Sequence, residues 1–169
     1  LTTSSAASDV YKRQPLTLST ITERNVLSSF IDEKDENAVW NNHVSLALWA
    51  DLMLIAPASA NTLSKMATAA ADNLLMAIYL SSKCPVFFAP AMDLDMHEHL
   101  ANKKNIDQIV ANGNTLIPAT SGPLASGLNG KGRMQEPQKI IQIIEDYFKL
   151  KSPLSPVSYT HLRAHETLL

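Results

Sequence analysis

A short segment of small and polar residues, Pro57–Thr62 (PASANT), directly follows an apolar run and precedes a helical pattern. Its hydroxyl and amide side chains are those of Ser59, Asn61 and Thr62. Its alanines leave room for a ligand to approach the backbone, and unpaired N–H groups at a helix start favour an anion such as a phosphate. Helix N-capping by Ser59, Asn61 or Thr62 is the alternative. The segment by itself leaves both interpretations open.

A second segment with possible chemistry is the glycine-rich stretch at residues 119–134 (ATSGPLASGLNGKGRM). Gly127, Gly130 and Gly132 have the spacing G-x-x-G-x-G, which is the reverse of the dinucleotide fingerprint. A phosphate-binding loop needs Ser or Thr after its lysine, whereas Gly132 follows Lys131. The stretch indicates either a flexible flap that covers a ligand or an ordinary surface loop.

Titratable side chains offer two further possibilities. His43 is a candidate acid or base, although a lone histidine can also be structural. Five residues near position 96 resemble a metal cluster: Asp93, Asp95, His97, Glu98 and His99. They do not form H-E-x-x-H, and His97 and His99 would point to different sides of a helix, so we expect no metal. Cys84 precedes a strand and is expected to be a small buried side chain.

Three apolar runs are expected to position these residues. They are Asp51–Ala56, Pro85–Ala89 and Thr115–Ile117, each short, continuous and followed by small residues or proline. Continuous apolar runs are typical of strands buried on both faces of a parallel sheet.

Helical patterns alternate with these runs. We predict helices over Val39–Trp49, Leu63–Ser81, His99–Ala111 and Pro137–Leu150. Alternation of strands and helices predicts a three-layer α/β fold, with a parallel sheet, helices on both faces and right-handed crossovers. Ligands of such folds bind at the carboxyl ends of the strands. Pro57–Thr62, Pro90–Met96 and residues 119–134 should share that edge, and the chemistry should lie there.

Composition limits the class of protein. The chain has 169 residues, of which 46% are hydrophobic and 18% charged, and its net charge is −2. These values are ordinary for a globular domain and give no general attraction to nucleic acid or to an anionic membrane. No apolar run is long enough to span a bilayer, and the first residues lack the apolar core of a signal peptide. A single cysteine suits a reducing compartment, so we expect a cytoplasmic protein.

The two ends differ from the rest of the chain. Residues 1–14 and 155–169 lack periodicity, and SSAASDVYKRQ and VSYTHLRAHET resemble translated sequencing-adapter sequence. A pair of disordered tails is the alternative. In either case the ends are excluded from the expected domain, residues 15–154, and His161 and His165 receive no functional role.

Four segments in a fixed order carry a family resemblance: NHVSLALWAD, PASANT, PAMDLDM and LASGLNGKGRMQEP. With them, residues 15–154 resemble the homo-oligomeric flavin-containing cysteine decarboxylases. The resemblance implies a Rossmann/flavodoxin-like fold whose first strand is missing from this sequence, and FMN as the cofactor. It also implies a homotrimer or higher homo-oligomer, and a fused synthetase domain in a full-length parent protein.

The resemblance also implies roles for individual residues. The FMN-binding segment corresponds to Ser59, Ala60, Asn61 and Thr62, and Ala91 falls where the next loop touches the flavin. His43 corresponds to the catalytic histidine. Asp93, Leu124 and Ala125 fall at substrate-binding positions, and Ser126 at the position of a catalytic cysteine in the flap.

The implied activity is FMN-dependent decarboxylation of 4′-phosphopantothenoylcysteine to 4′-phosphopantetheine in coenzyme A biosynthesis. Two residues depart from the family pattern. Ser126 is less acidic than a thiol, and Asp93 stands where the family has Asn, which places a carboxyl group near the substrate carboxylate unless Arg133 or another subunit compensates. Two alternatives therefore remain: an oxidative decarboxylase of peptidyl C-terminal cysteine, and a non-catalytic flavin-binding regulatory module.

Overall fold

The computed structural model describes residues 15–31 and 41–151 of the chain. The ends expected to be tails, residues 1–14 and 155–169, lie outside the described residues, as does Val39. The first described element, helix α2 (Pro15–Thr22), buries none of its side chains, and its sequence pattern had not indicated a helix.

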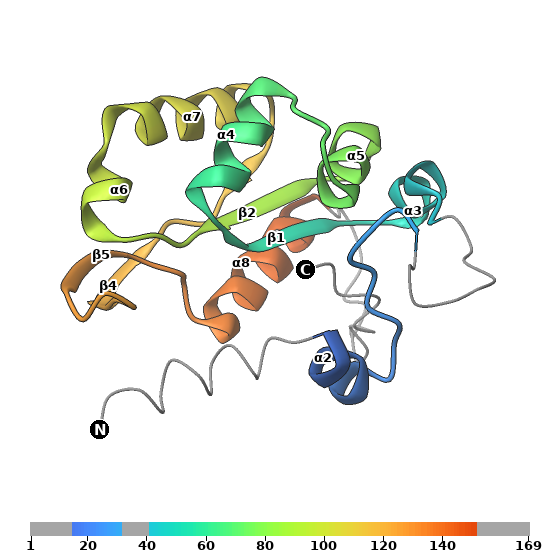
Figure 1. Cartoon of the computed structure of the whole chain (residues 1–169), viewed down its shortest axis with the longest axis horizontal. Helices are drawn as coiled ribbons and strands as arrows, with labels where there is room; N and C mark the ends of the chain where they lie inside the picture. Colours follow the sequence, from blue (N-terminus) through green and yellow to red (C-terminus); the bar gives the residue numbers. More distant parts are fainter. Residues whose placement is uncertain (1–14, 32–40, 152–169) are drawn as a thin grey trace.

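The centre of the fold is a parallel sheet of three strands, in the order β1-β2-β3 (Figure 1). They are β1 (Met53–Ala58), β2 (Val86–Pro90) and β3 (Thr115–Leu116). Ile55 pairs with Phe88, which pairs in turn with Leu116. All five residues of β2 are buried, because this strand has a neighbour on each side and helices above and below. The three predicted strands are confirmed, but the predicted burial on both faces holds only for β2, since Leu54, Ala56 and Pro57 of β1 are exposed.

One face of the sheet is covered by helices α4 (Ala60–Thr68), α5 (Leu74–Ser81) and α7 (Leu100–Ala111) (Figure 1). Their buried side chains form one core with alternate residues of the strands: Ile55, Leu63, Met66, Met76, Phe88 and Ile109. Helix α3 (His43–Trp49) joins this core through Ala47. Each large side chain buried in this way stabilises the fold by about 1.5–3 kcal/mol.

Helix α8 (Pro137–Lys151) covers the other face (Figure 1). Ile140 and Ile144 of this helix pack with Phe87 and Ala89 of β2 and with Ile117. Phe87 and Phe88 are thus both fully buried but belong to different cores, because successive side chains of a strand point to opposite faces. The predicted three-layer arrangement, with helices on both faces, is confirmed.

The single helix predicted over Leu63–Ser81 is wrong, because two helices connect β1 to β2. Helix α4 ends at Ala69, which has a left-handed φ of 58°, and its backbone N–H donates to the Lys65 carbonyl oxygen. Asn73 then caps α5, and its side chain accepts a hydrogen bond of 2.9 Å from the Met76 N–H. Ala69 therefore ends one helix and Asn73 begins the next, each at a position that capping residues commonly occupy.

The glycine-rich stretch is also more ordered than the predicted loop. It contains an antiparallel hairpin of β4 (Thr120–Pro123) and β5 (Asn129–Arg133), in which Gly122 pairs with Gly130. A short helix, α6 (Leu94–Glu98), follows β2 and precedes α7. In Figure 1 the hairpin and α6 lie together at one end of the molecule, and α3 lies at the other end.

Candidate functional site at the carboxyl edge of the sheet

The turn between β1 and α4 forms the first part of the site. Ser59 caps α4, because its Oγ accepts a hydrogen bond of 3.2 Å from the Thr62 N–H and lies 3.0 Å from Thr62 Oγ1. The predicted N-cap is therefore confirmed at Ser59. The backbone N–H groups of Ala60 and Asn61 have no hydrogen-bond partner among the described residues. Two free donors beside small side chains suit an anionic group of a ligand.

The turn after β2 is joined directly to the turn after β1. The Ala91 N–H donates a hydrogen bond of 3.0 Å to the carbonyl oxygen of Ala58, which is fully buried. This bond places Ala91 beside the start of α4. All five residues predicted to bind the cofactor therefore lie in two adjoining turns: Ser59, Ala60, Asn61, Thr62 and Ala91.

The β4–β5 hairpin is docked on the same turn. The Met92 N–H donates a hydrogen bond of 3.0 Å to the Gly132 carbonyl oxygen. A β-carbon added to Gly132 would lie only 2.3 Å from the Met92 carbonyl oxygen, and Gly132 has a φ of 150°. Only glycine therefore permits this approach of the two backbones. Gly130 has a similar role, because a β-carbon there would lie 2.9 Å from a methyl group of Leu94.

Asp93 and Ser126, the two departures from the family pattern, contact each other. The Ser126 hydroxyl donates a hydrogen bond of 2.7 Å to Asp93 Oδ1, across 33 positions of the chain. Asp93 occupies the N-cap position of α6 but makes no capping hydrogen bond with its side chain. Its carboxyl group therefore holds the flap.

The remaining flap residues form the turn of the hairpin. The Leu124 N–H donates to the Leu128 carbonyl oxygen at 2.8 Å, and the Gly127 N–H donates to the Leu124 carbonyl oxygen at 3.0 Å. Leu124 is half-buried, whereas Ala125 is exposed. Arg133 does not serve as the expected counter-charge for Asp93, because its Nη2 forms an ion pair of 2.8 Å with Glu136 Oε1.

His43 lies away from this edge within the chain. It is the first residue of α3, which packs against α5 beside the amino ends of β1 and β2, opposite the hairpin (Figure 1). Its ring meets Phe30 edge to face, with 6.0 Å between ring centroids. Nδ1 of His43 is buried and has no hydrogen-bond partner among the described residues. An unpaired buried ring nitrogen is unusual and suggests a partner outside the described residues.

The possible metal cluster does not form in the part of the chain that the structure describes. Residues 15–31 and 41–151 contain no group of three His, Cys, Asp or Glu side chains that could hold a metal ion. His97 belongs to α6, whereas the His99 Nδ1 caps α7 by accepting a hydrogen bond of 3.2 Å from the Ala101 N–H. Cys84 is half-buried, and burial raises the pKa of its thiol. Within these same ranges no helix has the length and apolar character needed to cross a membrane.

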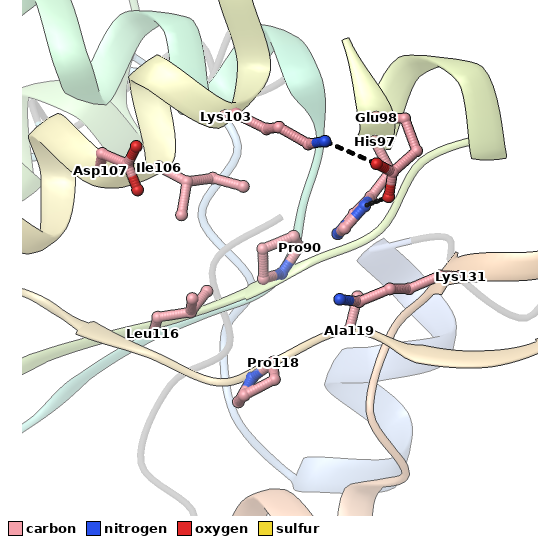
Figure 2. A pocket seen from close by; sticks show the side chains of 10 residues that line it. All are labelled: Pro90, His97, Glu98, Lys103, Ile106, Asp107, Leu116, Pro118, Ala119 and Lys131. Carbon is pink, nitrogen blue, oxygen red and sulfur yellow. Dashed lines mark hydrogen bonds and ion pairs between the residues drawn. The ribbon is translucent and has the colours of Figure 1, made fainter. Parts of the chain in front are cut away.

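A cavity of 340 Å³ borders the site, and its basic residues were not assigned a function from the sequence (Figure 2). His97, Lys103 and Lys131 line it from three different elements. Their separation along the chain follows no motif, so only the folded structure reveals that they lie together.

The layered parallel sheet, with its ligand-facing turns at the carboxyl edge, defines a flavodoxin-like α/β protein. The model of the Flavoprotein family matches residues 1–149, and the chain belongs to this family.

Two curated relatives show the range of the family. The chain is 52% identical over 137 residues to a cysteine/cysteine sulfinic acid decarboxylase from an unknown prokaryotic organism, a match that covers 81% of this chain and 38% of the relative. It is 37% identical over 134 residues to the coenzyme A biosynthesis bifunctional protein CoaBC of Bacillus subtilis (strain 168), covering 79% of this chain and 32% of that protein. The chain thus spans about a third of the length of these relatives.

Solved structures give the same fold. A Cys-to-Ser variant of PPC decarboxylase, complexed with pantothenoylaminoethenethiol, matches with a TM-score of 0.63 and 36% identity, covering 68% of this chain and 64% of that chain. The FMN-dependent cysteine decarboxylase SpaF matches with a TM-score of 0.63 and 29% identity, covering 78% of this chain and 69% of that chain.

Proposed function

We propose that this domain binds FMN and decarboxylates a cysteine-derived acid, with 4′-phosphopantothenoylcysteine as the first candidate substrate. The observation that carries the proposal is the chain of contacts at the carboxyl edge. Hydrogen bonds from Ala91 to Ala58, from Met92 to Gly132 and from Ser126 to Asp93 join the positions predicted to bind the cofactor and the substrate, which supports a single site there. The relatives with coenzyme A biosynthesis and PPC decarboxylase in their names support this substrate.

The residues of the β1–α4 turn fit the cofactor. The free N–H groups of Ala60 and Asn61 would hold its phosphate, and the side chain of Ala60 is small enough to admit the rest of the group. When bound, FMN would supply a reversible two-electron oxidation of the substrate thiol, so that the net reaction is the loss of carbon dioxide.

Ser126 and Asp93 would deliver the proton that the product needs after decarboxylation. The thioaldehyde formed from the substrate thiol stabilises the negative charge left by decarboxylation, and the product then needs a proton. Ser126 is exposed, so its hydroxyl can relay a proton from a water molecule to the product, while Asp93 Oδ1, which accepts the hydrogen bond from Ser126, orients that hydroxyl. This pair would take the place of a single, more acidic thiol.

His43 would act on the edge of a neighbouring subunit. Its separation from the carboxyl edge of its own chain and its unpartnered Nδ1 support an assembly in which subunits complete one another's sites. This supports the expected homotrimer or higher homo-oligomer. Sedimentation of the FMN-loaded protein tests it, and an active monomer would contradict it.

The location is proposed to be the cytoplasm. A lone cysteine whose thiol pKa is raised suits a reducing compartment, and the named relatives in coenzyme A biosynthesis are consistent with it. Fractionation of cells that make the tagged protein tests this location.

Free cysteine or cysteine sulfinic acid is the second candidate substrate. It is favoured by the relative of that name, at 52% identity, and by the chemistry of Asp93. The carboxyl group of Asp93 can pair with the ammonium group of a free amino acid, which an acylated cysteine lacks.

The test supplies the FMN-loaded protein with phosphopantothenoylcysteine, cysteine and cysteine sulfinic acid in separate reactions. Carbon dioxide and the products are measured by mass spectrometry. Phosphopantetheine is the expected product, and an amine from only the free amino acids would favour the second candidate. Accumulation of an ene-thiol from a peptide ending in cysteine would favour peptidyl-cysteine oxidation. No turnover of any acid by flavin-loaded protein would overturn the proposal in favour of a non-catalytic module.

A further inference from the structure

The cavity beside the site has a basic end and an apolar wall (Figure 2). It lies at the carboxyl ends of β2 and β3, between α6, α7 and the β4–β5 hairpin. Ile106, Leu116 and Pro118 form the apolar wall. At the other end, the ring of His97 and the ammonium group of Lys131 point toward the space beside Pro90.

The charges at the basic end do not cancel. Glu98 is occupied by Lys103, with 2.6 Å between Nζ and Oε2, and by His97, with 3.4 Å between Nδ1 and Oε1. These contacts lower the pKa of the Glu98 carboxyl, with the hydrogen bond from Lys103 as the largest cause. Lys131 has no ion-pair partner in the described part of the chain. Asp107 lies across the cavity, beyond Ile106, in Figure 2. Lys131 therefore presents a positive charge that is not neutralised nearby.

The cavity lies close to the proposed reaction site, and backbone hydrogen bonds join the two. The His97 N–H donates a hydrogen bond of 2.9 Å to the Asp93 carbonyl oxygen, so the basic end lies one helical turn from the Asp93–Ser126 pair. Lys131 precedes Gly132, whose carbonyl oxygen accepts the hydrogen bond from Met92. A molecule that enters the site could therefore extend from Asp93 into the cavity.

We propose that this cavity binds the phosphorylated, branched apolar end of an acylated cysteine substrate. Lys131, with His97 and Lys103, would hold the phosphate monoester, while Ile106 and Leu116 would contact the apolar part. This inference rests on the proposed function, because it assigns the remote end of that substrate to a place in the structure. It makes Lys131 a residue that determines specificity for phosphorylated substrates.

Binding of 4′-phosphopantothenate, which lacks the cysteine, tests the inference without any turnover. Calorimetry on the FMN-loaded protein should show Lys131→Gln weakening its binding by about tenfold, since a charged hydrogen bond is lost. Glu98→Gln should strengthen binding, because it removes a negative charge near the phosphate. Unphosphorylated pantothenate should bind each variant equally. Lys139→Gln is the matched control, because Lys139 is exposed on α8 and does not line the cavity.

A general loss of structure would weaken phosphopantothenate binding in both Lys131→Gln and Glu98→Gln. Weaker binding in the first variant and stronger binding in the second therefore cannot be explained by misfolding. In turnover, Lys131→Gln should raise KM for phosphopantothenoylcysteine about tenfold, with kcat unchanged and no effect on pantothenoylcysteine. Equal effects on the phosphorylated and unphosphorylated molecules, or none on either, would overturn the inference. If no acid is decarboxylated but phosphopantothenate binding still depends on Lys131, the proposed function fails and the anion site stands.

Discussion

The two sides of the carboxyl edge are built in different ways. The β1–α4 turn is held by a local hydrogen bond, because the Ser59 side chain caps a helix that starts at the next residue. The β2–α6 turn instead depends on a hairpin that lies more than thirty positions further along, through the bonds Met92–Gly132 and Ser126–Asp93. The first region should tolerate changes elsewhere in the chain, whereas the second should lose its geometry when the hairpin no longer docks.

The difference has a chemical meaning. A cofactor that stays bound needs a rigid site, and a turn that is capped locally provides one. A substrate must enter and leave, and a hairpin held by a few long-range bonds can open without unfolding the sheet. Four of the five positions predicted to bind the cofactor belong to the first region, whereas Ala91 and the positions predicted to bind the substrate belong to the second.

Gly132→Ala should have the largest effect of the changes considered, because it should prevent the β4–β5 hairpin from docking on the β2–α6 turn. The added β-carbon would collide with the Met92 carbonyl oxygen, and the φ of 150° is unfavourable for alanine. We expect a loss of about 3 kcal/mol in the free energy of unfolding, or an undocked hairpin on an intact sheet. Urea denaturation measures the first outcome, and amide hydrogen exchange of β5 the second. Gly127→Ala is the control: its φ is 86° and nothing lies within 4 Å, so about 1 kcal/mol is expected. Equal losses in both variants would contradict tight docking at Gly132.

Ser59→Ala should weaken the first region by a smaller amount. The change removes the acceptor of the Thr62 N–H and should lower the free energy of unfolding by about 1 kcal/mol. Thermal denaturation measures it, and hydrogen exchange in the β4–β5 hairpin should stay unchanged because the hairpin does not depend on this cap. Ser64→Ala, at an exposed position within the same helix, should change stability by less than about 0.5 kcal/mol. A Ser59→Ala variant as stable as Ser64→Ala would mean that the cap contributes nothing.

Ser126→Ala should have the smallest effect on stability. The bond to Asp93 is exposed, so its loss should cost about 0.5 kcal/mol. A double-mutant cycle with Asp93→Ala isolates the coupling, which should account for most of that value. Faster hydrogen exchange at Leu124 and Leu128, with no change at Thr62, would localise the effect to the flap. Ser121→Ala, an exposed serine in β4, is the control and should leave exchange at both sites unaltered.

Much of the fold follows from local patterns. The runs ending in Ala56, Ala89 and Ile117 predicted three buried strands because every residue of such a run must avoid water. The break between α4 and α5 was missed, since the apolar pattern continues across it, and only the backbone reveals the left-handed Ala69. The hairpin was missed as well, because a segment with three glycines indicates conformational freedom. Its contact with the backbone of Met92 is what gives the hairpin a fixed shape.

The sequence by itself determined the layered α/β class and the strands, because these depend on residues that are neighbours along the chain, and it offered Ser59 as one of three possible helix caps. Through its motifs it also named the residues of the carboxyl edge. Only the tertiary structure decided that Ser126 meets Asp93, that His43 lies at the opposite end, and that Lys131 shares a cavity with His97. Such contacts join positions far apart in the chain, and their geometry is set by the packing of whole elements, which no local pattern specifies.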